Sequence, residues 1–189
     1  MSSGKNILLT KEKISLLLDK LSSELINSFT IKELNNAAFL GIQLKGVPLS
    51  ERLAKKIKDT HDIIIPIGTL DITMHRDDFG LRKKLPNIRP TEVPFDLDDK
   101  IIILVDDVLH TGRTIRAALD AITDYGRPKL IRLAVLIDRG AQEFPIKADF
   151  TGETMKINPD DKIVVTWTET DNADEVYSLS SQSNKGKKQ

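Results

Sequence analysis

Two adjacent carboxylates, Asp106 and Asp107, stand at the end of an apolar run and shortly precede a Thr-Gly turn. The apolar residues 101–105 have the continuous hydrophobic character of a strand buried on both faces of a parallel sheet. Residues 110–114 lead directly into an expected helix, whose backbone N–H groups and hydroxyls would suit a phosphate. Carboxylates beside that phosphate can accept hydrogen bonds from sugar hydroxyls. The segment therefore predicts a binding site for a ribose 5-phosphate group.

Two other interpretations of this segment use the same residues. The first is an ordinary buried strand that ends in two solvated aspartates. The second is the acidic strand of a P-loop nucleotidase, which requires a G-x-x-x-x-G-K-[ST] loop elsewhere. The chain contains no such loop and no G-x-G-x-x-G sequence, so neither a P-loop nor a dinucleotide-binding fold is favoured.

The first half of the chain predicts two helices and a strand that could position this site. Apolar residues at helical spacing, from Ile14 to Leu25, predict an amphipathic helix over residues 11–28 with Thr10 as its N-cap. Residues 37–42 are expected to form the first strand of the sheet. A second helix should follow, with Pro48 in its first turn, where proline is tolerated.

The second half of the chain continues the alternation of strands and helices. Residues 63–66 and 70–74 are expected to be extended, and residues 80–99 to form a mobile loop. A helix with apolar positions from Ile115 to Ile122 should end near Gly126 and Pro128. Strands are predicted at residues 130–137 and 162–168. This alternation favours an α/β fold with a central parallel sheet flanked by helices.

Composition limits the classes of protein that the chain can represent. Its 189 residues, 40% hydrophobic and 30% charged, fit one globular domain over residues 1–177, followed by a polar tail at 178–189 that we expect to be disordered. No apolar run is long enough to span a bilayer, and Lys11, Glu12 and Lys13 interrupt any signal-peptide pattern. The absence of cysteine predicts a cytoplasmic location. A net charge of zero does not favour constitutive nucleic-acid binding.

The strand, the acidic pair and the Thr-Gly-Arg-Thr turn resemble the phosphoribosyl-pyrophosphate (PRPP) signature of type I phosphoribosyltransferases. Residues 68–78, 134–140 and 144–149 are similar to pyrimidine-operon regulators of the PyrR type, and the likeness extends from about Ile7 to about Val176. That resemblance implies a parallel sheet with helices and a small hood. It also implies uracil phosphoribosyltransferase activity, which forms UMP and pyrophosphate from uracil and PRPP, and a homo-oligomer, either a dimer or larger.

The resemblance assigns roles to residues in several segments. Asp106 and Asp107 would face the ribose hydroxyls, and Arg76 would contact pyrophosphate from a loop that closes over the reacting atoms. Lys45 and Gly46 would hold pyrophosphate. Relatives carry arginine at the position of Lys45, and because lysine cannot make the planar bidentate contact, PRPP binding is expected to be weaker. The segment that wraps the 5′-phosphate would be His110, Thr111, Gly112, Arg113 and Thr114, with the Arg113 side chain pointing away. The segment that reads the base would be Ile137, Asp138 and Arg139.

Mg²⁺ is the implied cofactor, held mainly by substrate oxygens and water rather than by protein ligands. Simpler interpretations remain for some of these residues. Lys45 could be an exposed surface lysine, and Arg76 could belong to a solvated charge cluster with Asp77 and Asp78. His61 and His75 are expected to be structural or surface residues.

An RNA-binding regulator of pyrimidine genes, sensing uridine nucleotides with little or no catalysis, is the alternative function. RNA affinity rests heavily on phosphate contacts from Lys and Arg. Several positions that are basic in relatives differ here, although Lys147 remains basic and the tail carries Lys185, Lys187 and Lys188. The first helix and the later loop offer Asp19, Lys20, Ser23, Ser28, Ala141, Gln142, Glu143 and Glu153. We therefore expect catalysis to be retained and RNA binding to be weakened or absent. Specificity for another base, such as a purine, is a third interpretation.

Overall fold

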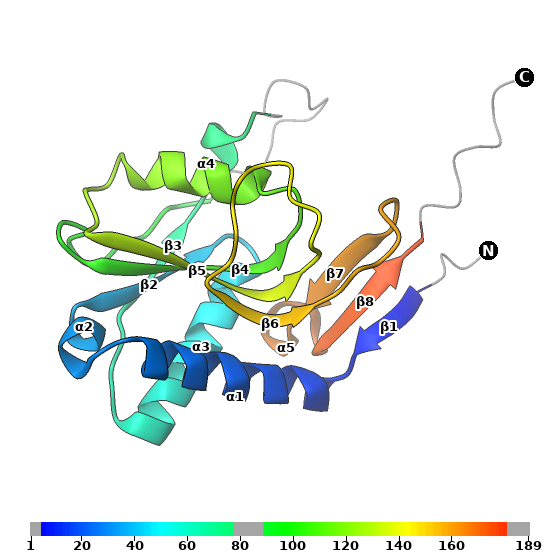
Figure 1. Cartoon of the computed structure of the whole chain (residues 1–189), viewed down its shortest axis with the longest axis horizontal. Coiled ribbons are helices and arrows are strands. Elements are labelled where there is room, and N and C mark those ends of the chain that lie inside the picture. The colour runs from blue at the N-terminus through cyan, green and yellow to red at the C-terminus, as the bar shows by residue number, and fades with distance from the viewer. Residues whose placement is uncertain (1–4, 78–88, 181–189) are drawn as a thin grey trace, which may run out of the picture.

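A five-stranded parallel sheet forms the centre of the molecule (Figure 1). The computed structural model describes residues 5–77 and 89–180. The strands lie in the order β3-β2-β4-β5-β6. Because they are parallel, the chain makes a crossover connection from β2 to β3, from β3 to β4 and from β4 to β5. Their bounds are β2 Ala37–Ile42, β3 Ile67–Leu70, β4 Ile101–Leu109, β5 Leu130–Asp138 and β6 Phe150–Thr154.

Helices cover both faces of this sheet, as predicted. Helices α1 (Lys11–Ser28) and α3 (Gly46–His61) pack on one face, and α4 (Arg113–Ile122) lies on the other (Figure 1). The predicted bounds of α1 and β2 are confirmed, and Pro48 lies in the first turn of α3. Each face has its own apolar core, because β2, β4 and β5 alternate their buried side chains between the two.

A one-turn helix, α2 (Ile31–Asn35), was not predicted. Thr30 and Glu33 form a capping box, in which Thr30 accepts the Glu33 N–H and Glu33 accepts the Thr30 N–H. Such a short element buries only Leu34 and leaves no helical periodicity in the sequence.

A second, antiparallel sheet forms the predicted hood. It contains β1 (Lys5–Leu9), β8 (Glu175–Leu179) and β7 (Lys162–Thr166), and the short helix α5 (Thr168–Asp171) connects β7 to β8. We use "the hood" for these four elements, which lie beside the end of the main sheet (Figure 1). The strand predicted at 162–168 is therefore two residues too long and belongs to this sheet instead of the parallel one.

The predicted start of the polar tail, residue 178, lies two residues too early. Ser178 is buried and Leu179 ends β8, because the final strand pairs with both β1 and β7. Residue 180 follows this strand, and residues 181–189 lie outside the described part of the chain.

The segment after β3 differs from its prediction. Residues 63–66 precede the strand without joining it, and the extended stretch predicted at 70–74 instead contains a 3-10 helix, Thr73–His75. The Asp71 side chain causes this turn, because it accepts the Thr73 N–H at 2.7 Å. Within the predicted loop, residues 80–88 lie outside the described residues, and Glu92 pairs with Thr69. Among the residues described, no helix has the length and apolarity that crossing a membrane would require.

Candidate functional site

A cavity of about 400 Å³ opens beyond the carboxyl ends of β2, β3 and β4. Ligands bind at this edge in open α/β sheets. Its lining includes residues predicted from four separate segments, namely Lys45, Arg76, Asp106, Asp107 and Thr114. The topology therefore brings together the predicted pyrophosphate, ribose and 5′-phosphate groups.

The acidic pair lies at the buried end of β4. Asp106 is only 6% exposed, and its Oδ1 accepts the Asp107 N–H at 2.9 Å. Burial, and then the charge of Asp107, raise the pKa of Asp106 well above its usual range, although Arg76 acts in the opposite direction. Burial also raises the pKa of Asp107, against hydrogen bonds that favour its charged form. The two carboxyls thus tend to retain a proton unless a cation or hydroxyl donors compensate.

The turn after β4 presents an open helix N-terminus. Gly112 has φ 91°, in the left-handed region, and it begins α4 without a capping side chain. A Cβ at Gly112 would lie 3.3 Å from Cβ of Phe144, so a larger residue would be both strained and crowded. Thr111 Oγ1 accepts the Arg113 N–H at 3.4 Å. The amides of this first turn are suited to an anion such as a phosphate.

The Arg113 side chain points away from the turn. Its guanidinium donates to Asp77 and to Glu143, each at 2.8 Å, and lies over the Phe144 ring. Only its backbone is therefore placed to contribute to phosphate binding, in agreement with the expected orientation. The side chain instead links the segment that follows Arg76 to the loop after β5.

His110 lies next to the buried Arg139. The Arg139 Nη1 atom is 3.5 Å from Nδ1 of His110, and its Nη2 donates to the Asn158 carbonyl oxygen at 3.2 Å. Burial, and then the charge of Arg139, lower the pKa of His110. The neutral form of the His110 imidazole is therefore favoured in this site.

The three predicted base-reading residues do not line the cavity, although they are adjacent to it. In the β4–β5 register, Ile137 pairs with Val108 and Asp138 with Leu109. Ile137 is fully buried in the core, so any contact from it would come from its backbone. The Asp138 carboxylate accepts the Gly140 N–H and the Gln142 amide, each at 2.7 Å. This carboxylate shapes the loop after β5.

Lys45 and Gly46 occupy the predicted position after β2. A Cβ at Gly46 would lie 2.2 Å from the Val105 carbonyl oxygen, so only glycine allows α3 to begin against β4. Lys45 lines the cavity, yet its ammonium donates to Thr170 Oγ1 at 2.9 Å and pairs with Asp171. The peptide bond between Gln43 and Leu44 is cis.

Other lining residues were not predicted. They are Gln43, Leu44, Asp71, Ile72, Thr73, Arg89 and Val108. Asp71 accepts the Arg89 N–H and the Thr73 N–H, and its own N–H donates to Thr91 Oγ1 at 3.0 Å. Asp71 therefore connects the segment after β3 to residues 89–91. Its position directly after a strand was a signal that could have identified it.

The donor set restricts how a metal could be held. Within residues 5–77 and 89–180, no group of three or more His, Asp or Glu side chains is arranged to hold a metal ion. The cavity instead offers the carboxylates of Asp71, Asp106 and Asp107 along its lining. Hard oxygen groups of this kind suit Mg²⁺ that keeps most of its ligands from substrate and water.

Comparisons with known proteins agree with this geometry. The phosphoribosyl transferase domain family matches residues 5–172. The bifunctional protein PyrR of Pelotomaculum thermopropionicum is 46% identical over 179 residues, covering 95% of this chain and 98% of that protein. The bifunctional protein PyrR of Chloroflexus aurantiacus is 50% identical over 151 residues, covering 80% and 83%.

Solved structures share the fold at low sequence identity. A hypoxanthine-guanine phosphoribosyltransferase from Bacillus anthracis has a TM-score of 0.69 at 16% identity, covering 95% of this chain and 99% of that one. A hypoxanthine phosphoribosyltransferase from Trypanosoma cruzi, in complex with IMP, has a TM-score of 0.71 at 14% identity, covering 96% and 94%. The chain belongs to the phosphoribosyltransferase family and, within it, to the bifunctional PyrR proteins.

Proposed function

We propose that this phosphoribosyltransferase transfers the phosphoribosyl group of PRPP to uracil, forming UMP and pyrophosphate. The observation that carries the proposal is one cavity in which Asp106, Asp107 and Thr114 meet the cations Lys45 and Arg76. Each type of group suits one part of PRPP. The carboxylates suit ribose hydroxyls, the start of α4 suits the 5′-phosphate, and the cations suit pyrophosphate.

The reaction needs no protein nucleophile. Displacement at C1′ passes through an oxocarbenium-like state with positive charge on the sugar and negative charge on the leaving group. In this assignment, Asp106 and Asp107 stabilise the sugar side, while Lys45 and Arg76 stabilise the leaving group. Positioning and electrostatic stabilisation of this kind can supply most of the rate enhancement in enzymes.

The acidic pair is compatible with the Mg²⁺ that the family uses. Two buried carboxyls with raised pKa values lie where a cation would favour their charged forms. When bound with PRPP, Mg²⁺ would neutralise charge on the pyrophosphate group. Asp106 and Asp107 are the residues that would face it, directly or through water.

The choice of uracil rests on the end of β5 and the loop that follows it. Residues 134–140 carry the resemblance to the PyrR type, and Asp138 holds the following loop through Gly140 and Gln142. Backbone groups of that loop would read the base edge. Assays with uracil, hypoxanthine and guanine separate this assignment from a purine specificity.

The test is formation of UMP from uracil and PRPP with Mg²⁺, measured in parallel on Asp107→Asn and on Asp120→Asn. Asp120 is an exposed carboxylate of α4 and serves as the matched control. We expect turnover in the native protein and the control, and its collapse in Asp107→Asn. A native protein that binds PRPP but transfers it to none of these bases would contradict the proposal.

A second candidate function is RNA-dependent regulation, favoured by the name that the curated relatives share, bifunctional protein PyrR. Several residues of the corresponding surface are engaged within the protein. Asp19 pairs with Lys56, and Lys20 donates to the carbonyl oxygens of Thr151 and Gly152. This arrangement supports weak RNA binding. A gel-shift measurement with pyrimidine-operon leader RNA, with and without UMP, tests it, and tight binding would make regulation the main function.

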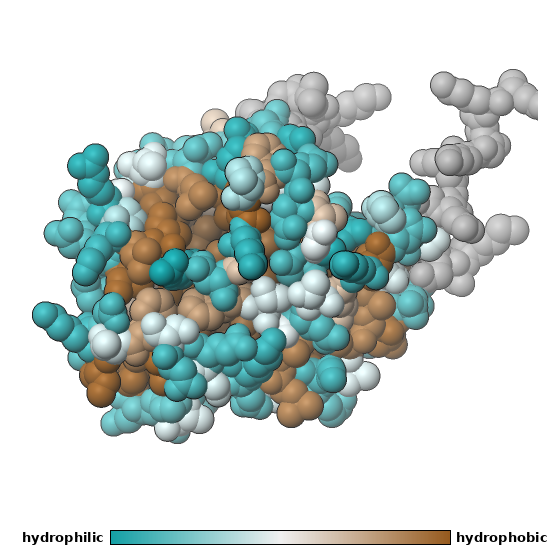
Figure 2. Space-filling view, viewed as in Figure 1, coloured by the Kyte–Doolittle hydropathy of each residue, from teal (hydrophilic) through white to brown (hydrophobic). Residues whose placement is uncertain are grey.

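We also propose that the protein forms a homo-oligomer, either a dimer or larger. Figure 2 shows apolar side chains gathered on one side of the face in view, between α4 and α1. Exposed apolar area of this kind is a common feature of subunit interfaces. Light scattering at several protein concentrations would give the number of subunits.

A further inference from the structure

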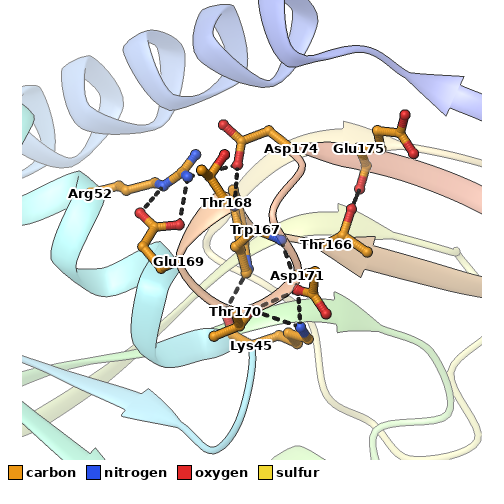
Figure 3. Close-up of polar contacts among 10 residues, drawn as sticks. All are labelled: Lys45, Arg52, Thr166, Trp167, Thr168, Glu169, Thr170, Asp171, Asp174 and Glu175. Atoms are coloured by element: carbon orange, nitrogen blue, oxygen red, sulfur yellow. Dashed lines mark hydrogen bonds and ion pairs between the residues drawn. The ribbon is translucent and has the colours of Figure 1, made fainter.

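Lys45 belongs to two regions at once. The residue lines the cavity and its charge acts on Asp107, and its ammonium donates to Thr170 Oγ1 at 2.9 Å and pairs with Asp171 (Figure 3). Both partners lie in α5 of the hood, more than 120 residues along the chain. An ammonium has three N–H donors. The two contacts use two of them, and a phosphate oxygen in the cavity would be the third acceptor.

Asp171 is itself held in place. Its Oδ2 accepts the Trp167 N–H at 3.0 Å and the Thr170 hydroxyl at 2.6 Å. Burial would raise the pKa of this carboxyl, but its hydrogen bonds and the charge of Lys45 lower it to about 2. Asp171 is therefore ionised at neutral pH and remains a fixed partner for the ammonium.

The hood also holds the backbone of Lys45. The indole Nε1–H of Trp167 donates to the Lys45 carbonyl oxygen at 3.0 Å, and Trp167 is fully buried. Arg52 of α3 stacks over the indole ring, 4.6 Å from its centroid, and pairs with Asp174 and Glu169 (Figure 3). The position of α5 relative to the start of α3 is thus set by several contacts.

These contacts matter because lysine is flexible. Its four-carbon stem has many rotamers, and ordering it on a ligand opposes binding, whereas the planar fork of arginine is pre-organised. We propose that Asp171 and Thr170 are positioning residues that hold the Lys45 ammonium at the pyrophosphate side of the cavity. The proposal deepens the proposed transfer reaction and rests on it for the identity of the ligand.

Binding of pyrophosphate tests the proposal without requiring catalysis. Isothermal titration calorimetry with pyrophosphate and Mg²⁺ would compare the native protein with Asp171→Ala, Asp171→Asn and Thr170→Val. We expect Asp171→Ala to lower the affinity about tenfold and Thr170→Val to lower it about threefold, because the ammonium must then be ordered by the ligand alone. KM for PRPP should rise accordingly, with a smaller change in kcat.

Two further variants separate positioning from a general effect on the hood. Glu175→Gln is the matched control, because Glu175 is a hood carboxylate that pairs with Lys5 and not with Lys45. Its pyrophosphate affinity should equal that of the native protein. In a Lys45→Arg background, Asp171→Ala should change the affinity less than twofold, because the planar guanidinium is already pre-organised and depends less on Asp171 for its position.

Three outcomes would overturn the proposal. These are unchanged affinity in folded Asp171→Ala, tighter binding in that variant, and an equal loss in the Lys45→Arg background. Tighter binding would mean that Asp171 competes with pyrophosphate for the ammonium. If the native protein binds pyrophosphate but forms no nucleotide from any base, the transfer proposal fails while the Lys45 measurements stand.

Discussion

The carboxyl edge of the parallel sheet and the hood treat charge in opposite ways. At the sheet edge, burial raises the pKa values of Asp106 and Asp107, the charge of Asp107 raises that of Asp106 further, and α4 begins without a capping side chain. In the hood, Asp171 and Asp174 have cationic partners and lowered pKa values. At the sheet edge the charged forms of the carboxyls are disfavoured until a ligand compensates them, whereas the hood carboxylates are compensated by cations of the protein itself. Binding sites of enzymes commonly sacrifice stability in this manner.

The largest expected effect is on stability, from Trp167→Ala. Trp167 is fully buried where the hood meets the core. Its removal should lower the free energy of unfolding by about 3–5 kcal/mol. Below the new melting temperature, the folded variant should keep most of its kcat. Chemical denaturation measures this loss. Trp167→Phe keeps most of the packing and should lose only about 1 kcal/mol with the bond to Lys45. Equal losses in both variants would contradict this assignment.

Removing charge from the hood should have the next largest effect. The Asp174 side chain is 6% exposed and accepts from Arg52 and from the Thr168 N–H. Asp174→Asn should therefore cost about 2 kcal/mol of stability, because a partly buried guanidinium loses one of its two carboxylate partners. Thermal unfolding at pH 7 measures it. A Tm equal to that of the native protein would mean that Glu169 alone suffices.

The same comparison predicts an acid-dependent loss from the hood. Burial opposes ionisation of Asp171, but its hydrogen bonds and Lys45 lower its pKa from 3.8 to about 2. A lowered pKa contributes stability that is present above the unfolded value and is lost as the pH falls through the folded one. Fluorescence of Trp167, the single tryptophan, should report loosening of the hood between about pH 4 and pH 2. In Asp171→Asn, that part of the transition should be reduced.

The sheet edge should respond in the opposite direction. Asp106→Asn removes one of two repelling buried carboxyls while keeping the oxygen that accepts the Asp107 N–H. We expect stability at pH 7 to increase by about 1 kcal/mol while kcat/KM falls by about a hundredfold or more. Parallel unfolding and turnover measurements test this. Loss of both stability and activity would show that the pair is structural. It would contradict the difference drawn here between the sheet edge and the hood.

The smallest predicted effect is proton release on binding. Since the raised pKa of Asp106 favours a retained proton, PRPP with Mg²⁺ should displace part of it, up to about one proton per site. The affinity should then increase with pH through the raised pKa. Calorimetry in buffers of different ionisation enthalpy measures the released fraction. Asp106→Asn should abolish it, and identical release in that variant would assign the proton to another group.

Much of the parallel sheet and its site could be predicted from local sequence. The bounds of α1 and β2 follow from periodicity and from a continuous apolar run. The acidic pair and the Thr-Gly turn lie within nine residues, so that one strand and one helix start suffice to place them. The hood was less predictable. The short elements β1, α5 and β8 leave weak periodicity, and strand 162–166 gives no sign of the sheet that it joins.

The sequence by itself determined the family, the phosphate-binding turn and the residues that could meet PRPP, because each depends on residue types at short spacing. Tertiary structure alone decided where the Lys45 ammonium lies, that Arg139 contacts His110, and that Ile137 faces the core. Those outcomes depend on contacts between segments far apart in the chain. Such contacts form only when the sheet order and the packing of the hood are set, and neither leaves a local pattern in the sequence.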